Sequence, residues 1–250
     1  MKLPSNREEL RERWKSGEEF RFHLFYGHKP PTEGVDASCL SQWFVRVFTI
    51  DEIDYPTAEH WMMAEKARLF GDQAMLKEIL ASEGPRDAKA FGRKVTGFDN
   101  QVWGKHKFDI VVKGNLAKFG QHDDLKQFLL STASLNATSD QRAVDTPARD
   151  TGANDLQLAA ESKATYDVDS DAGPSKVNEI HERPVPYSLG PTAKGSNVIL
   201  VEAAGRDTIW GIGLGVANPK SQDPFTWRGL NLLGFALTLV RDQLLSLIHI

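Results

Sequence analysis

A helix predicted over residues 58–70 carries two side chains that could act together in acid–base or nucleophilic chemistry. Glu59 and Lys66 are seven residues apart with Met63 between them, so all three fall along one face of the helix. Glu59 lies in the first turn, where the helix dipole favours an ionised carboxylate. A lysine that is partly removed from water holds its proton less tightly, and its free amine can attack C1 of a sugar. The spacing is equally compatible with an ordinary solvated helix face.

A second group of candidate residues follows much later in the chain. Glu202 ends a predicted strand, and Asp207 stands in the turn that leads to Trp210. A carboxyl group beside an apolar aromatic surface can exchange a proton near neutral pH, because burial raises its pKa. Trp210 offers a ring for stacking, and Gly211 and Gly213 let a ligand approach the backbone. These glycines lack the spacing of a dinucleotide-binding loop, so a plain glycine-rich turn explains them as well.

Phosphate groups could be bound at three further places. Gly229 and Asn231 stand at the entry of the last predicted helix, where free backbone N–H groups attract anions. Arg93 and Lys107 belong to short basic clusters that could meet phosphates. Close helix packing through small residues would explain the first motif, and a solvated surface would explain the two clusters.

These side chains need a scaffold, and the hydrophobic periodicity predicts one rich in helices. Helices are predicted over residues 6–14, 58–70, 85–92, 105–119, 125–130 and 230–244, and strands over 20–26, 43–48 and 198–202. Thr57 is placed to cap the second helix, and Gly71 follows its end. Many helices with a few scattered strands predict an α+β fold rather than a parallel doubly wound sheet.

Residues 133–197 differ from the rest of the chain in composition. They contain no Trp, Phe, Met or Cys, and they hold 10 of the 34 acidic residues and 6 of the 30 basic ones, which leaves 24 of each elsewhere. Such a stretch buries too little apolar surface to offset its conformational entropy. We interpret it as a disordered insertion within one discontinuous domain, residues 1–132 and 198–244. A linker between two domains is the alternative.

The overall composition, 40% hydrophobic and 26% charged residues, is typical of a globular protein. A single cysteine, Cys39, and seven histidines without ligand spacing predict neither a metal site nor a cofactor. We expect an intracellular protein, cytoplasmic or nuclear, with no membrane segment, because the longest apolar run, 232–240, is too short to span a bilayer. The apolar tail 245–250 is interpreted as a remnant outside the domain.

Several motifs, taken in order, resemble those of the NADAR family, also called YbiA-like. They are Leu40-Ser41-Gln42-Trp43, Tyr55-Pro56-Thr57-x-Glu59-His60, Ala64-x-Lys66, Gly92-Arg93, Trp103-x-x-x-Lys107, Leu116-x-Lys118-Phe119, Leu129-Leu130-x-Thr132, Leu200-Val201-Glu202, Asp207-x-x-Trp210-Gly211-x-Gly213, Gly229-x-Asn231-x-Leu233-Gly234 and Arg241. The resemblance covers residues 20–132 and 198–244. It departs from the family at Ser41-Gln42-Trp43, where Ser-Asn-Phe is usual, and at the long segment 133–197, where the family has a compact junction.

The resemblance implies a metal-independent enzyme that hydrolyses N-glycosidic bonds. ADP-ribose attached to guanine, in nucleic acid or in nucleotides, is the first candidate substrate. Phosphoribosyl-pyrimidine intermediates of riboflavin biosynthesis are the second. A non-catalytic module that binds NAD or ADP-ribose is an alternative of another class, and a protein that recruits partners through its acidic segment is a further one.

Residue roles follow from the resemblance in the same way. Lys66 is the candidate covalent nucleophile, and Glu59 and Asp207 are candidates for proton transfer or charge stabilisation whose roles could exchange. Tryptophan rings are candidates to stack on a base or adenine. The residues expected to bind substrate are Ser41, Gln42, Trp43, His60, Arg93, Trp103, Lys107, Glu202, Trp210, Gly211, Gly213, Gly229 and Asn231.

Overall fold

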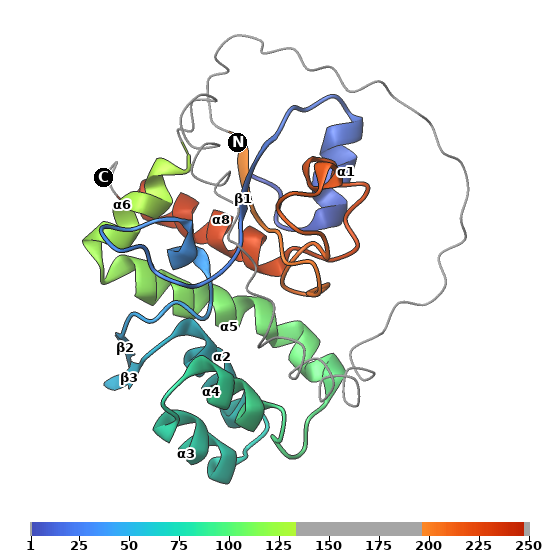
Figure 1. The fold of residues 1–250 in the computed structure, drawn as a ribbon. Helices are drawn as coiled ribbons and strands as arrows, with labels where there is room; N and C mark the ends of the chain where they lie inside the picture. The colour runs from blue at the N-terminus through green and yellow to red at the C-terminus, as the bar shows by residue number, and fades with distance from the viewer. Residues whose placement is uncertain (1, 134–196, 248–250) are drawn as a thin grey trace, which may run out of the picture. The chain divides into compact units, whose positions relative to one another are not determined.

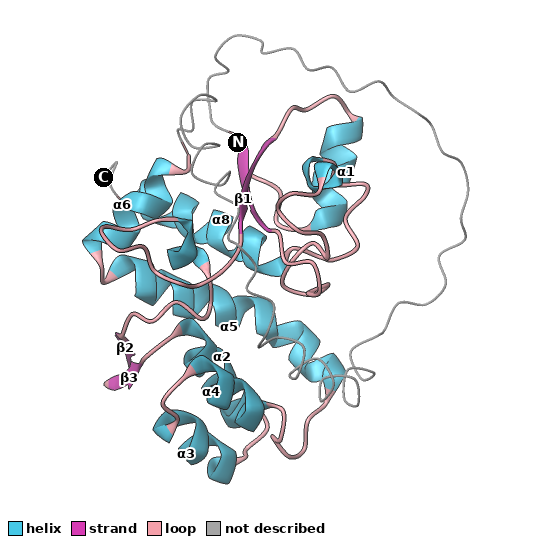
Figure 2. Ribbon diagram, viewed as in Figure 1, coloured by secondary structure: helices cyan, strands magenta, loops and turns pink. Residues whose placement is uncertain are grey.

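Helices are the main regular structure of the described residues, and the strands are few and short, as Figures 1 and 2 show. The structure is a computed structural model, and it describes residues 2–133 and 197–247. In chain order the elements are α1 (Arg7–Lys15), β1 (Arg21–Phe25), the 3-10 turn η1 (Ala37–Leu40), β2 (Phe48–Ile50), β3 (Ile53–Tyr55), α2 (Ala58–Leu69), α3 (Gln73–Ala81), α4 (Pro85–Gly92), α5 (Asn100–Gly120), α6 (Asp123–Ser131), β4 (Val198–Glu202), the 3-10 turn η3 (Pro219–Gln222) and α8 (Leu232–Ser246). The predicted helix-dominated α+β fold is confirmed.

Strands from the two ends of the chain pair with each other. β1 runs parallel to β4, with Arg21 opposite Val198 and Phe25 opposite Glu202. The first four residues of β4 are buried, as expected for a strand that is covered on both faces. The pairing joins the part of the chain before residues 134–196 to the part after them, so the two belong to one folded unit. The predicted disordered insertion itself lies outside the described residues, apart from Ala133 and Asn197.

Helix α8 packs against β4 and α5 and completes this core (Figure 1). Its Arg241 is fully buried, and the guanidinium donates to the Val198 carbonyl at 2.7 Å and to Thr132 Oγ1 at 3.2 Å. Burying a charged group is costly unless it is hydrogen-bonded. Arg241 thereby connects Thr132, close to the start of the segment 134–196, with β4, the first strand after that segment.

Helix α2 begins where the sequence predicts and is packed closely by its neighbours. The Thr57 hydroxyl accepts the backbone N–H of His60 at 3.3 Å and caps the helix. A Cβ atom at Gly92 of α4 would overlap the side chain of Met63. One at Gly114 of α5 would overlap the ring of Trp61. These glycines let α4 and α5 approach α2 closely enough to fix its position.

The strand predicted over 43–48 is wrong for all but its last residue. Residues 43–47 form a loop, and β2 begins at Phe48 and pairs antiparallel with β3. The hairpin turn passes through Asp51 and Glu52, both with positive φ. Val45 and Val47 fit a strand pattern, but they are exposed and so have no sheet to pack against. An apolar alternation predicts a strand only where one face is covered.

Other differences concern helix ends and one helix that was not predicted. α5 begins five residues before the predicted start because Asp99 accepts the N–H of Val102 and caps it. α3 is absent from the prediction although Asp72 caps it in the same way. α8 continues through Leu245 and Ser246, so the predicted tail begins inside a helix.

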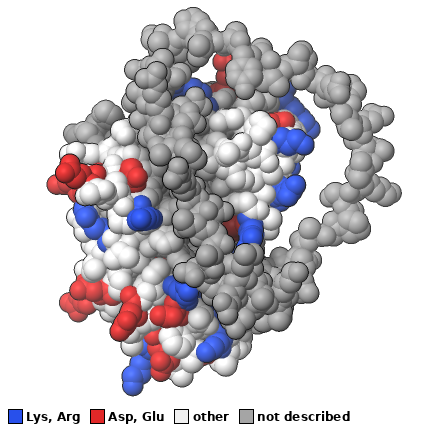
Figure 3. All heavy atoms as spheres, viewed as in Figure 1, with Lys and Arg blue, Asp and Glu red and all other residues white. Residues whose placement is uncertain are grey.

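Charged side chains of both signs are interspersed on the face shown in Figure 3. This agrees with the equal numbers of acidic and basic residues outside 133–197. None of the helices in the described part of the chain is both long and apolar enough to cross a membrane.

Candidate active site

The candidate site is a pocket where the start of α2, the end of β4 and the start of α8 meet α4 and the segment that follows η1. Its empty volume is about 320 Å³, part of which is open to solvent. We call it the carboxylate pocket, because three carboxyl groups line it. The lining residues are Ser41, Gln42, Trp43, Glu59, Met62, Lys89, Glu202, Asp207, Trp210 and Leu233.

Glu59 is held in the first turn of α2 with a buried carboxyl group. Its backbone N–H donates to the carbonyl of Gln42 at 3.0 Å, which fixes the helix start against the segment after η1. The residue is only 2% exposed, and Oε1 has no hydrogen-bond partner in the described structure. Burial raises the pKa of Glu59, while the positive charge of Lys89 and a hydrogen bond with Trp43 oppose the rise.

Glu202 ends β4 and directs a second buried carboxyl oxygen into the pocket. Its N–H donates to Asn231 Oδ1 at 3.0 Å, and its carbonyl accepts the N–H of Ile212 at 2.9 Å. The residue is partly exposed, but Oε2 is buried and has no partner in the described structure. Burial raises the pKa of Glu202 to about 8, and the negative charge of Asp207 adds to the rise. Most of the Glu202 carboxyl is therefore protonated at pH 7.

Asp207 organises the turn that carries Trp210. Its Oδ1 accepts the N–H groups of Ile209 at 2.9 Å, Trp210 at 2.7 Å and Gly211 at 3.4 Å. The carboxylate thus fixes the backbone that positions the tryptophan ring. It also faces Glu59 and Glu202 closely enough to raise the pKa of both.

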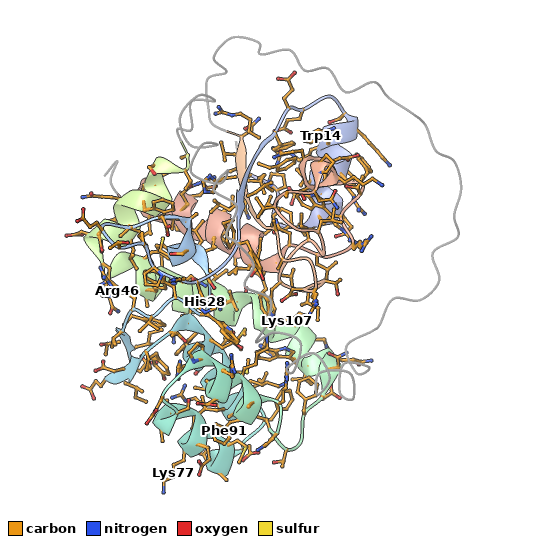
Figure 4. All side chains as sticks on the ribbon, in the orientation of Figure 1. Trp14, His28, Arg46, Lys77, Phe91 and Lys107 are labelled. Atoms are coloured by element: carbon orange, nitrogen blue, oxygen red, sulfur yellow. The ribbon has the colours of Figure 1, made fainter. Side chains whose placement is uncertain are left out.

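Two partly exposed tryptophans, Trp43 and Trp210, form apolar walls of the pocket. The ring of His28, labelled in Figure 4, lies 5.5 Å from that of Trp43. The Lys89 ammonium lies 5.8 Å from the centre of the same ring. A flat ligand between such walls is held by stacking while its polar edge meets the carboxyl groups.

The structure does not bring Lys66 into the carboxylate pocket. Two helical turns separate it from Glu59, and its Nζ lies 4.0 Å from the ring centre of Phe98 and 5.8 Å from that of Trp103. Trp103 itself is 7% exposed and belongs to the core. The expected common ligand of Glu59 and Lys66 would have to extend beyond the lining residues.

Gly229 and Asn231 lie in close backbone packing, and the phosphate site expected there stays a prediction. The N–H groups of residues 230–233 donate to the carbonyls of residues 208–211, so the entry of α8 has few free donors. Asn231 is buried, has a left-handed φ of 56° and donates to the Leu200 carbonyl at 3.0 Å. A Cβ atom at Gly229 would meet the backbone of Thr208, and one at Gly211 that of Glu202. Small residues here serve close packing, the alternative interpretation of the motif.

Ser41 and Gln42 also line the pocket, whereas the other predicted residues lie around it. His60 is fully buried, with Nδ1 2.7 Å from Thr57 Oγ1 and Nε2 3.2 Å from the Ser82 carbonyl. Gly213 has a φ of 68° and packs against Arg228. Exposed Arg93 follows α4 and lowers the pKa of Glu59 through its charge. Lys107, labelled in Figure 4, lies partly exposed on α5.

Three residues that matter for the site were not predicted as site residues. Lys89 lines the pocket from α4 and acts electrostatically on both buried glutamates. Lys118 is fully buried on α5 and donates to the carbonyls of Cys39 at 2.7 Å and Ser41 at 2.9 Å. Asn115, one turn earlier on α5, donates to Gln42 Oε1 at 2.8 Å. A charged or amide side chain within an otherwise apolar helical face was the available signal for the two α5 residues.

Across residues 2–133 and 197–247, no group of three or more His, Cys, Asp or Glu side chains is arranged to hold a metal ion. The three carboxyl groups of the pocket are spread over α2, β4 and the turn after β4. Metal-independent chemistry stays a prediction, which chelation can test.

Several known proteins are similar to this chain in sequence, and one solved structure is similar to it in fold. An N-glycosidase, R617, of Acanthamoeba polyphaga mimivirus is 29% identical over 89% of this chain and 96% of its own length. The N-glycosidase YbiA of Escherichia coli K12 is 33% identical over 39% of this chain and 58% of its own. The solution structure of E. coli YbiA superposes with a TM-score of 0.54 at 20% identity, covering 93% of this chain and 89% of that one.

The protein irg-1 of Caenorhabditis elegans is 24% identical over 77% of this chain and 62% of its own length. A sequence model of the NADAR domain matches residues 24–145 and 193–245, which include every residue that lines the carboxylate pocket. The chain belongs to the NADAR domain family.

Proposed function

We propose that the carboxylate pocket hydrolyses the C–N bond between a ribosyl group and a base. One observation carries this: Glu59 Oε1 and Glu202 Oε2 are both buried, both without a partner in the described structure, and both at a pocket walled by tryptophans. Buried polar atoms are normally satisfied, and unsatisfied ones at a pocket indicate a missing ligand. Relatives of this chain are named N-glycosidases, which supports the same chemistry.

In the proposed reaction the bond between C1 and the base nitrogen breaks with its electron pair on the base. The Glu202 carboxyl, protonated at neutral pH, gives its proton to the departing base. Positive charge that builds up on C1 is stabilised by the carboxylate of Asp207 and by that of Glu202 once its proton has left. Glu59, whose pKa burial also raises, is the second group proposed for proton transfer. A water molecule adds to C1, and its proton passes to a carboxylate, so the products are the free base and a ribosyl group with a hydroxyl at C1.

The preferred substrate is ADP-ribose attached to guanine, in nucleic acid or as a nucleotide. With the base and its ribosyl C1 at the carboxyl groups, the diphosphate would extend out of the pocket. Lys89 on the pocket wall and Arg93 after α4, whose charges both act on Glu59, are the proposed phosphate partners. A phosphoribosyl-pyrimidine is the second candidate, because it presents the same ribosyl C–N bond to the same carboxyl groups. A covalent role for Lys66, which lies beside Phe98 and Trp103, requires a substrate that extends from the pocket to this side chain. A module that binds NAD or ADP-ribose without cleaving it would need no proton donor, so the pKa of Glu202 argues against it.

The test is to incubate the protein with ADP-ribosylated guanine and with a phosphoribosyl-pyrimidine, and to follow base release by chromatography. Glu202→Gln keeps the shape of the side chain but has no proton to give, so turnover should fall by about 100-fold or more. Gln243→Glu, on the partly exposed surface of α8, is a control that should leave turnover unchanged. Binding of either compound without base release would contradict hydrolysis and favour the binding module.

A further inference from the structure

Gln42 presents a buried, unpaired N–H donor at the carboxylate pocket. The side chain is 6% exposed, lines the pocket, and its Nε2 has no hydrogen-bond partner in the described structure. Its Oε1 is occupied, because it accepts from Asn115 Nδ2 at 2.8 Å. A buried amide N–H without a partner is costly, so a pocket that keeps one is built for an acceptor that arrives with the ligand.

The orientation of the Gln42 amide follows from the hydrogen bond between Asn115 and the backbone carbonyl of Val111, since a carbonyl can only accept. Asn115 Nδ2 also lies 2.9 Å from the backbone carbonyl of Val111, one turn earlier on α5. A carbonyl oxygen needs a donor, so the nitrogen of Asn115, and not its oxygen, faces both Val111 and Gln42. Gln42 must then turn its oxygen towards Asn115, which leaves Nε2 as the donor. The backbone of α5 thus determines which atom of Gln42 a ligand meets.

The backbone around Gln42 is equally restrained. Its carbonyl accepts the N–H of Glu59, and Lys118 binds the carbonyls of Cys39 and Ser41 on the preceding residues. Side chain and main chain are therefore held by α2 and α5 before any ligand binds. Preorganised donors discriminate strongly between ligands, because nothing has to rearrange when the right acceptor is present.

We propose that Gln42 determines specificity by donating its Nε2–H to a ring carbonyl of the base, and that Asn115 is the positioning residue that sets this donor. The proposal rests on the proposed function, since it assumes that the base occupies the carboxylate pocket. It goes further by naming the feature that the pocket selects: an acceptor oxygen on the base, as in 6-oxopurines and oxopyrimidines.

The test uses binding, so that it does not depend on turnover. Guanosine 5′-monophosphate and its 6-thio analogue differ at one ring substituent, where sulfur is larger than oxygen and a much weaker acceptor. The variants below separate the two effects, because a preference caused by size would survive the loss of the Gln42 donor. Calorimetry should show that the protein prefers the oxygen compound by about tenfold. Gln42→Met, which keeps the length of the side chain without the amide, should reduce the preference to about twofold or less. Its affinity for the thio analogue should change little.

Asn115→Leu provides an independent variant that leaves Gln42 in place. Leucine has a similar size but can neither donate nor accept, so the Gln42 amide loses the partner that sets its orientation and the preference should again be reduced. Gln121→Met, the same kind of change at the residue that follows α5, is the control and should keep the full preference, because the Gln121 amide pairs with the backbone of Thr49 and not with the pocket. Thermal unfolding of each variant separates loss of the fold from loss of the donor.

Equal affinity of the unmodified protein for both nucleotides would overturn the role of Gln42, and so would an undiminished preference in Gln42→Met or Asn115→Leu. The proposed function fails separately: if the preference behaves as expected but the protein releases no base from any ribosylated substrate, Gln42 stays a specificity residue and hydrolysis is overturned.

Discussion

Replacing Glu202 by glutamine should change how the stability of this protein depends on pH. Burial raises the pKa of Glu202 to about 8, from an ordinary value of 4.5. The folded protein therefore keeps a proton on Glu202 over a range in which the unfolded chain has lost it. The stability that goes with this proton is fully present below about pH 4.5 and is lost as the pH rises through 8. Glutamine stays neutral over the whole pH range, so the unfolding free energy of Glu202→Gln does not contain this pH-dependent loss.

The size of the effect follows from the pKa difference. Each pH unit between the two values removes about 1.4 kcal/mol of unfolding free energy from the unsubstituted protein relative to the variant. Between pH 5 and pH 8 the difference should therefore grow by about 4 kcal/mol and then level off. Partial exposure of Glu202 lets water reach the charge, so about 4 kcal/mol is an upper value. At neutral pH and above, Glu202→Gln should be the more stable protein, although it is the less active one.

Urea unfolding at pH 5, 6, 7, 8 and 9 measures this difference directly. Glu59 shares the pocket and also has a raised pKa, so the pair of proteins Glu59→Gln and Glu59→Gln/Glu202→Gln should be compared in the same way. Glu83→Gln, on an exposed loop, is the matched control and should show no growing difference. A difference between Glu202→Gln and the unsubstituted protein that stays constant from pH 5 to pH 8 would refute the reasoning. Glu202 would then be ionised at neutral pH and could not be the proton donor.

The remaining predictions concern Lys66, metal ions and the segment 134–196. If Lys66 attacks C1, Lys66→Ala and Lys66→Arg should both lose turnover and borohydride should trap an adduct in the unsubstituted protein; activity retained in Lys66→Arg, with no adduct, would exclude the covalent role. Base release should persist in EDTA, and a loss that one specific divalent ion restores would contradict metal independence. Replacing 134–196 by a short Gly/Ser linker should preserve folding and turnover on small substrates, because Arg241 and the β1–β4 pair hold the flanking residues; loss of the cooperative thermal transition would show that the segment belongs to the core.

Local signals in the sequence were sufficient for most helices. Thr57 caps α2, Pro85 begins α4 after Gly84, and Gly71 follows the end of α2 with a positive φ of 72°. These features act within a few residues of the backbone they control, so their effect can be read without a fold. The strand predicted over 43–48 failed for the converse reason. Whether Val45 and Val47 lie in a sheet depends on a neighbour that no local pattern describes.

The site divides in the same way. The residue types of the pocket could be recognised in the sequence, since Glu59, Glu202, Asp207 and the tryptophans were candidates by chemistry and by family resemblance. Which of these residues share a pocket could not be recognised in the sequence. Helical spacing pairs Glu59 with Lys66, whereas the packing of α4 brings Lys89 to the pocket instead. The protonation of Glu202 and the orientation of Gln42 likewise depend on burial and on partners from distant elements. The sequence alone determined which groups can do chemistry here; only the tertiary structure decided which of them share one pocket, because desolvation and hydrogen-bond geometry exist only once the chain is packed.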